Sequence, residues 1–284
     1  MPETYARRLI SLAAWPCAIV ETDGIPTGFV MPTIPDRFYM PLGTVKGVVQ
    51  VPAEAQHLLN QPDVLAARGI ELDDRRRLKL IYEVVSALEF LHQQGVCVGD
   101  FSPKNLLFSS AIHDDVYFVD CDTMRVNGIS AMTQIETPGW EVPAGEELAT
   151  NASDVYKLGL FALRLLVGDQ DVKDPNKLPP PLASFLGNVI AASLDPNPAG
   201  RPDLAIWKSA LENAATDLQQ KKLYENPGTS QVADTPLSAA FPQLRSRPVS
   251  PNAKADRGGE IRGSGGVQVR HRKWSTGHRS AGHG

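Results

Sequence analysis

The sequence predicts an α+β fold in which a little β structure comes first and helices follow. Two short apolar runs on either side of Asp23 and Gly24 are typical of a β-hairpin. Apolar residues then recur at helical spacing along 72–93 and again along 155–166. After residue 222 the composition becomes too poor in large apolar residues for a packed domain. We therefore expect a mostly helical body followed by a tail.

Length and composition exclude several classes of protein. A chain of 284 residues with 42% hydrophobic residues fits one large domain or two small ones. A net charge of −4 gives no reason to expect specific nucleic-acid binding. Three cysteines exclude a disulfide-rich scaffold, and the lack of a C-x-x-C pair argues against a structural zinc site. The longest apolar stretch, 155–167, is too short to cross a membrane, so we expect no span and a cytoplasmic protein.

The first elements follow from local patterns. The apolar run 9–20 is interrupted by Pro16, which predicts a short helix that ends before this proline. The hairpin strands are expected at 18–21 and 27–31. Two prolines, at 32 and 35, then predict an extended connector.

The remaining elements are mostly helical. The pattern along 72–93 predicts a long helix, which Gly95 ends. Ser153 and Asp154 are expected to cap the apolar helix 155–166. Short strands are expected at 96–98, 106–108 and 116–119, and the last helices at 182–193 and 204–214.

The last 62 residues differ from the rest of the chain. Only nine of them are Leu, Ile, Val or Phe, and nine Lys and Arg outnumber four Asp and Glu. This predicts a basic, disordered tail at 223–284 and leaves a net charge of −9 on a domain at 1–222. The basic end, 270–274, is suited to contact phosphates or an acidic surface; the alternative is a tail that is solvated or folds back weakly on the acidic body.

Three polar residues carry the chemistry that the sequence suggests. Asp100 and Asn105 are the two ends of one loop, and Asp120 follows a second short strand fifteen residues after Asn105. Antiparallel pairing of the strands would bring all three side chains to the same end of the strand pair, which we call the mouth. A carboxylate can accept a hydroxyl proton, and an amide oxygen with a second carboxylate can hold Mg²⁺. This is equipment for phosphoryl transfer; the alternative is that these residues only cap turns.

The pattern Asp100-x-x-x-x-Asn105 resembles the catalytic loop of the protein-kinase family, and Asp120-Cys121-Asp122 stands where that family has Asp-Phe-Gly. Further motifs of the family resemble segments 91–95, 137–143, 153–159, 195–196 and 201–202. Segments 14–16 and 28–32 resemble a bacterial Ser/Thr protein kinase-like branch, in which they form the last N-lobe strands and the hinge.

The resemblance implies a protein kinase-like fold with a mostly α C-lobe at 37–222 and a truncated β N-lobe with the hinge at 1–36. Residues 1–45 contain no Lys and no Gly-rich loop. The start of the N-lobe is therefore expected to be missing, through either a truncated start or a true pseudokinase.

The resemblance also implies roles for single residues. Asp100 would orient or deprotonate the acceptor hydroxyl, and Lys104 would neutralise the transferring group. Asn105 and Asp120 would bind the Mg²⁺ that bridges the phosphates of ATP. The adenine would lie over Leu107 and against the hinge residues Met31, Thr33 and Ile34.

Two departures from the family pattern affect regulation and structure. Val98 and Gly99 replace the His-Arg before the catalytic Asp, so we do not expect control by phosphorylation of the following loop. Ala144 replaces the Glu that pairs with the Arg at 201, and Glu146 or Glu147 is expected to substitute.

The function expected from the resemblance is transfer of the γ-phosphate of ATP to a Ser or Thr hydroxyl of a protein, whose identity the sequence does not give. A pseudokinase that acts as a binding module is the first alternative, because the Gly-rich loop and its Lys are lacking. A small-molecule kinase of the aminoglycoside type is the second, because its catalytic loop often begins Gly-Asp, as at Gly99 and Asp100.

Overall fold

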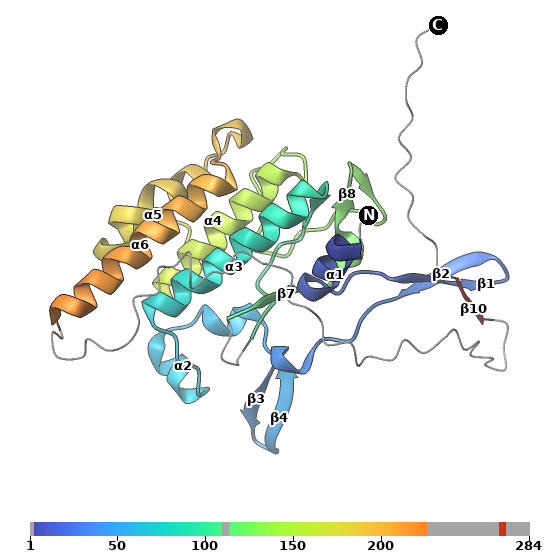
Figure 1. The fold of residues 1–284 in the computed structure, drawn as a ribbon, viewed down its shortest axis with the longest axis horizontal. Coiled ribbons are helices and arrows are strands. Elements are labelled where there is room, and N and C mark those ends of the chain that lie inside the picture. The colour runs from blue at the N-terminus through green and yellow to red at the C-terminus, as the bar shows by residue number, and fades with distance from the viewer. Residues whose placement is uncertain (1–2, 110–113, 226–266, 271–284) are drawn as a thin grey trace, which may run out of the picture.

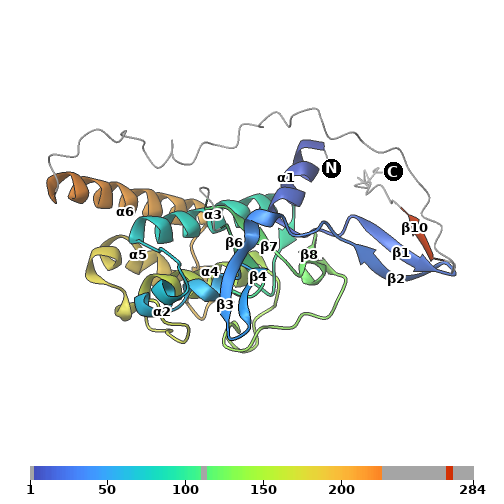
Figure 2. The same ribbon diagram turned by 90° about the horizontal axis from the view of Figure 1, so that it is seen from below.

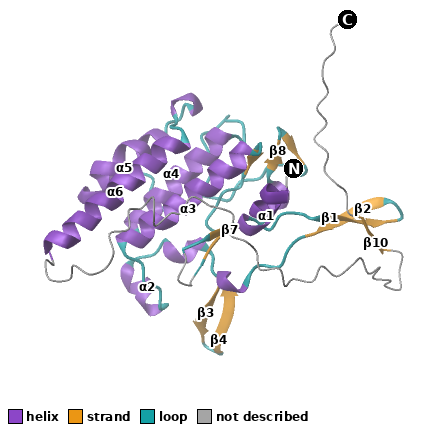
Figure 3. Ribbon diagram, in the orientation of Figure 1, coloured by secondary structure: helices purple, strands orange, loops and turns teal. Residues whose placement is uncertain are grey.

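The structure, a computed structural model, describes residues 3–109, 114–225 and 267–270. A bundle of helices forms one side of the molecule, and small antiparallel sheets lie on the other side (Figures 1 and 3). One continuous apolar core runs from Leu9 to Ala215 and joins both parts. The predicted α+β class, with small β elements and a mostly helical body, agrees with this architecture.

The N-terminal helix α1 (Glu3–Leu12) ends before Pro16, as predicted. Leu9 is buried on the core side of this helix. Just beyond it, the backbone N–H of Ala14 donates to the carbonyl of Phe118 at 2.9 Å. The start of the chain is thereby fixed to a strand of the body.

The predicted hairpin is present. Strands β1 (Ala18–Thr22) and β2 (Ile25–Val30) pair antiparallel. Asp23 and Gly24 connect them with φ angles of 52° and 80°. Positive φ at both central residues fits the right-handed twist of a hairpin, and Asp-Gly tolerates it.

The predicted tail at 223–284 lies mostly outside the described residues. Two parts of it are described, and both have regular structure. Helix α6 (Leu204–Glu225) continues past residue 222, and β10 (Val267–Arg270) pairs with the open edge of β1. The expected lack of structure therefore does not hold for Val267–Arg270, where two β-branched valines alternate with polar residues and favour a strand.

A second hairpin was not predicted. Strands β3 (Tyr39–Thr44) and β4 (Gly47–Pro52) pair antiparallel and project from the body (Figures 1 and 2). Prolines inside both strands hide the pattern, because prolines argue against strands unless they lie at an edge. Just before β3, the buried ring of Phe38 stacks on Tyr117 with 5.1 Å between ring centroids.

The helical body consists of α3 (Asp74–Gln93), α4 (Asn151–Val167), α5 (Pro180–Ser193) and α6, with the short α2 (Pro62–Ala67) beside them. Helix α3 packs against α4 and α6, and α5 packs against the same two helices (Figure 1). The four longer helices were predicted, and α2 was not. Gly95 follows α3 with a φ of 72°, which ends the helix as expected.

Helix α4 begins earlier than predicted. Its N-cap is Thr150, whose hydroxyl accepts from Ser153 N–H at 3.0 Å, while Ser153 Oγ accepts from Thr150 N–H at 2.8 Å. Ser153 contributes to capping as expected, but from the third helical position, whereas the expectation that Asp154 caps the helix is wrong because Thr150 is the N-cap. Asp154 is therefore free to bind elsewhere.

Between α3 and α4, the described residues form five short strands: β5 (Val96–Cys97), β6 (Leu106–Phe108), β7 (Val116–Phe118), β8 (Arg125–Val126) and β9 (Ile129–Ser130). Strands β6 and β7 pair antiparallel, with Leu106 opposite Phe118. Strand β8 pairs with both β5 and β9. The predicted strands here are confirmed to within one residue, and β8 and β9 are additions.

Over the described ranges, none of the helices is both long enough and apolar enough to cross a bilayer.

Candidate functional site

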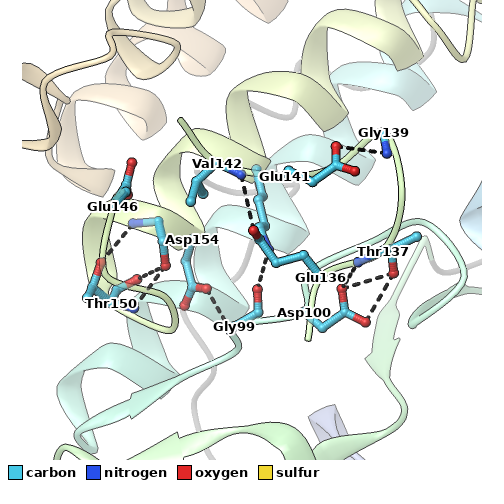
Figure 4. A network of polar contacts seen from close by, with 12 residues as sticks. Gly99, Asp100, Glu136, Thr137, Gly139, Glu141, Val142, Glu146, Thr150 and Asp154 are labelled. Carbon is cyan, nitrogen blue, oxygen red and sulfur yellow. Dashed lines mark hydrogen bonds and ion pairs between the residues drawn. The ribbon is translucent and has the colours of Figure 1, made fainter. Parts of the chain in front are cut away.

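The carboxylate of Asp100 is held by donors from two segments. The side-chain amide of Asn105 donates to Asp100 Oδ2 at 2.8 Å and to the Asp100 carbonyl at 3.0 Å. Thr137 donates its backbone N–H and its hydroxyl to Asp100 Oδ1, each at 2.9 Å. Figure 4 shows the carboxylate facing Thr137. The loop 100–105 is thus closed on itself and joined to a segment 37 residues away.

The backbone before Asp100 is positioned by Asp154. Its carboxylate is fully buried and accepts from the N–H groups of Val98 and Gly99 at 2.8 and 2.9 Å. The ring of His92 lies 2.9 Å from the same carboxylate. Asp154 thus has a structural role at this loop, and His92 is a hydrogen-bonded residue near the end of α3.

Gly99 is required by local geometry. Its φ is +74°, in the left-handed region. A Cβ at this position would lie 2.6 Å from Gln134 Oε1 and 3.0 Å from the Cβ of Ala149. No side chain fits here without displacing its neighbours.

The antiparallel pair β6–β7 brings Asn105 beside the segment that carries Asp120. The N–H of Val119 donates to the carbonyl of Asn105 at 2.9 Å. Asp120 itself has φ 57° and ψ 42°. A left-handed conformation is uncommon for a residue other than glycine and costs about 1–3 kcal/mol, and such strain is concentrated at functional sites.

Asp100 and Asp120 are close enough to repel each other electrostatically. Partial burial raises the pKa of Asp120, and the negative charges of Asp122 and then Asp100 raise this pKa further. A cation between these carboxylates would offset the repulsion. The amide nitrogen of Asn105 is engaged by Asp100, which leaves its side-chain oxygen for a cation. The donor set is therefore one carboxylate and one amide oxygen, hard ligands of the kind that Mg²⁺ takes.

A cage built wholly from protein acids does not form here. In the described part of the chain, no three His, Cys, Asp or Glu side chains are placed to hold a metal ion. In proteins Mg²⁺ is usually held by one or two carboxylates together with waters and substrate phosphates.

The other predicted catalytic residue, Lys104, is exposed. Across the residues that the structure describes, Lys104 makes no hydrogen bond or ion pair. Two positions earlier, Ser102 is fully buried, and its hydroxyl has no partner within the described segments.

The residues predicted to contact adenine belong to β6 and to the connector that follows β2. Leu107 is buried in β6, and Met31 and Ile34 are half-buried against the core. Thr33 is exposed. The stack of Phe38 on Tyr117 fixes the end of this connector to β7. No hydrogen bond within the described ranges links Met31, Thr33 or Ile34 directly to Asp100, Asn105 or Asp120.

Two residues of the site were not singled out from the sequence. Glu136 precedes Thr137, and its carboxylate lies 2.7 Å from the ammonium of Lys157 on α4. Lys157 is 1% exposed and also donates to the carbonyl of Gly99 at 2.7 Å. A lysine inside a strongly apolar helical run is the signal in the sequence, because a buried ammonium requires partners.

Glu146 pairs with Arg201 in place of the Glu that Ala144 replaces in the family pattern. Arg201 donates to both oxygens of Glu146, at 2.7 and 2.6 Å, and both side chains are at least 95% buried. Glu147 is exposed and pairs with Arg125 instead. Of the two candidates from the sequence, the structure therefore selects Glu146.

No protein-family model matches this chain. Over 104 residues it is 36% identical to calcium/calmodulin-dependent protein kinase type 1 of Macrobrachium nipponense, covering 34% of this chain and 29% of the relative. It is 34% identical over 113 residues to the serine/threonine-protein kinase PknJ of Mycobacterium bovis and of Mycobacterium tuberculosis, covering 37% of this chain and 19% of each relative. The chain spans less than a third of the length of these curated relatives. Distant homologues of this chain are thus Ser/Thr protein kinases.

Proposed function

We propose that this chain is a protein kinase-like phosphotransferase of the bacterial Ser/Thr branch, which moves the γ-phosphate of ATP to a Ser or Thr hydroxyl of a protein. The observation that carries the proposal is the convergence of Asp100, Asn105 and Asp120 at one end of the β6–β7 pair. The kinase homologues support the same reaction class.

Each residue at this mouth has a task that its contacts support. Asp100 is oriented by Asn105 and Thr137, so its carboxylate can align an acceptor hydroxyl and take its proton. Asn105 and Asp120 would hold Mg²⁺, which when bound neutralises charge on the phosphates. Lys104 is placed on the same loop to balance the charge of the transferring group. The nucleotide base would lie against Leu107 and the connector at 31–34.

The reaction class is tested by incubating the full chain with labelled ATP, Mg²⁺ and a mixture of protein acceptors. We expect label on Ser or Thr, and we expect Asp100→Asn to abolish the transfer while the variant stays folded. An aminoglycoside mixture serves as the parallel acceptor. Label on aminoglycosides alone would contradict the proposal in favour of a small-molecule kinase.

One observation favours a second candidate, a pseudokinase that binds a partner without transfer. Three donors, the N–H and hydroxyl of Thr137 and the amide of Asn105, already occupy both oxygens of Asp100. An acceptor hydroxyl must share or displace one of them. The same assay separates the candidates, because a binding module would label no acceptor and would behave identically after Asp100→Asn.

The partner is proposed to be a protein, and the basic end of the chain is suited to an acidic surface on it. We also propose that the protein works in the cytoplasm, where cysteines stay reduced. Cys17, Cys97 and Cys121 are all free thiols, which supports such a compartment.

A further inference from the structure

A buried ammonium lies behind the Asp100 loop. Lys157 is in the second turn of α4, among the fully buried apolar residues of that helix, and is 1% exposed. Its Nζ is 2.7 Å from the carbonyl of Gly99 and 2.7 Å from Glu136 Oε1. Burying a charge is costly unless the charge is paired and hydrogen-bonded, and these two contacts supply that compensation.

These contacts join three parts of the chain that are distant in sequence. Lys157 belongs to α4, Gly99 directly precedes Asp100, and Glu136 directly precedes Thr137. Glu136 also accepts from the N–H of Val142 at 3.1 Å, so its carboxylate ties together both ends of the segment 136–142. Figure 4 shows Glu136 directed toward Val142 while the adjacent Thr137 faces Asp100.

Residue 99, where the family pattern has Arg, cannot place a positive charge beside the segment 136–142. A side chain there would collide with Gln134 and Ala149, and the backbone has a positive φ. The positive charge that holds the segment 136–142 reaches it from α4 instead. Since both charges of the pair are encoded in the chain, the contact needs no added phosphate.

We propose that the Lys157–Glu136 pair is a permanent charge lock, which holds the segment 136–142 against the Asp100 loop and so keeps Thr137 on the Asp100 carboxylate. Lys157 and Glu136 are positioning residues in this arrangement. The consequence for phosphoryl transfer rests on the proposed function, whereas the positioning itself rests on the contacts alone. The site is arranged by encoded charges rather than by phosphorylation of the loop.

The test compares the full chain with Lys157→Met, with Glu136→Gln and with the double variant. Met retains the apolar stem of Lys157, and Gln retains an acceptor for Val142, so the milder Glu136→Gln keeps the test open if Lys157→Met does not fold. Lys208→Met is the matched control, because it removes a lysine that pairs with Glu89 between α6 and α3, away from this loop.

The first readout is hydrogen exchange of the amides of Thr137 and Val142, which donate to Asp100 and Glu136. We expect these amides to exchange about tenfold faster or more in each single variant, because loss of one partner leaves the other charge buried and unpaired. The double variant should add little beyond Lys157→Met, as expected for residues that act as a pair. Lys208→Met should leave both amides unchanged.

Exchange at Thr137 and Val142 that is equal in Lys157→Met, Glu136→Gln and the parent chain would overturn the proposal. So would protection that appears only after the loop is phosphorylated; we expect phosphatase treatment to leave it unchanged. If the parent chain transfers phosphate, both single variants should lower kcat and leave the KM for ATP unchanged. If it transfers none, the proposed function fails, while the exchange data still show whether the Lys157–Glu136 pair holds the segment 136–142.

Discussion

Asp154 organises the start of the site from a fully buried position. Its carboxylate accepts from two consecutive backbone N–H groups, at Val98 and Gly99, and lies beside His92. Charged acceptors of this kind make hydrogen bonds roughly twice as strong as neutral ones. The direction in which the chain leaves β5 toward Asp100 is therefore fixed by helix α4.

The first prediction concerns Gly99. Gly99→Ala should lower the free energy of unfolding by about 2 kcal/mol or more, because a positive φ costs an L-residue roughly 1–2 kcal/mol and the new Cβ also meets Gln134 and Ala149. Urea unfolding measures the change. Gly128→Ala is the matched control: its φ is +78°, but nothing lies within 4 Å of its Cβ, so only the backbone cost applies. Equal losses in both variants would refute the close packing around Gly99.

The second prediction concerns the raised pKa of Asp120. In the folded chain without metal, burial and the charges of Asp122 and Asp100 favour the protonated form. At pH values between the pKa of Asp120 in the unfolded chain and its higher pKa in the folded chain, the folded chain binds more protons. The contribution of Asp120 to the free energy of unfolding therefore falls as pH rises through the folded pKa. Asp120→Asn should therefore raise the Tm of the metal-free chain at neutral pH. The gain in unfolding free energy should be less than about 1 kcal/mol, because the carboxyl is partly exposed.

Thermal unfolding with EDTA at about pH 7 and about pH 3 checks this. At the lower pH the Asp120 carboxyl is mostly protonated in both the folded and the unfolded chain. The difference between parent and Asp120→Asn should shrink at the lower pH. A variant that is less stable than the parent at neutral pH would contradict the repulsion between Asp120 and its acidic neighbours.

At the scale of elements, the segment before α4 is attached to the helical body by Arg201. Its guanidinium reaches Glu146 with two bonds and donates to the carbonyl of Ala152 at 2.9 Å. The Arg201 guanidinium also lies over the ring of Tyr156, 4.8 Å from its centroid. The loop that follows Thr137 is thus fixed at its far end.

The third prediction follows from this attachment. Glu146→Ala should cost about 3–5 kcal/mol in unfolding free energy, because it leaves a buried guanidinium without its carboxylate. Glu147→Ala should change the unfolding free energy by no more than about 0.5–1 kcal/mol, because Glu147 is exposed and pairs on the surface. Chemical denaturation of both variants gives the comparison. Similar losses would show that the assignment of Glu146 is wrong.

The elements that could be predicted are those with a local signal. The Asp-Gly turn predicted β1 and β2, and helical spacing predicted α3 to α6. The hairpin of β3 and β4 has no such signal, because Pro41 and Pro52 lie within its strands. The start of α4 was misplaced because Ser153 fits both an N-cap and the third helical position, and only the reciprocal contact with Thr150 decides between them.

The site was predictable to a similar extent. The expectation that Asp100, Asn105 and Asp120 lie together depended on antiparallel pairing of the strands between Asn105 and Asp120, and β6 and β7 do pair in this way. The Lys157–Glu136 pair joins residues 21 positions apart on different elements. No local pattern specifies such a contact, so only the tertiary packing of α4 behind the loop discloses it.

In the whole molecule one apolar core contains residues of both the helical bundle and the short strands β6 and β7. Figure 2 shows how these elements are arranged. Residues 1–222 carry a net charge of −9, and the following 62 residues carry +5. At the proposed site an anionic nucleotide would therefore meet an acidic body, and bound Mg²⁺ would reduce the repulsion.

The most direct test of a nucleotide–magnesium site at Asp100, Asn105 and Asp120 is thermal unfolding of the full chain with and without Mg-ATP, alongside Asp120→Asn. Ligand at about one hundred times its dissociation constant adds roughly 2.7 kcal/mol, which raises Tm by about 5–10 °C for a domain of this size. We predict this rise in the parent chain and its loss in Asp120→Asn. An unchanged Tm in the parent chain, or an equal rise in Asp120→Asn, would contradict the account.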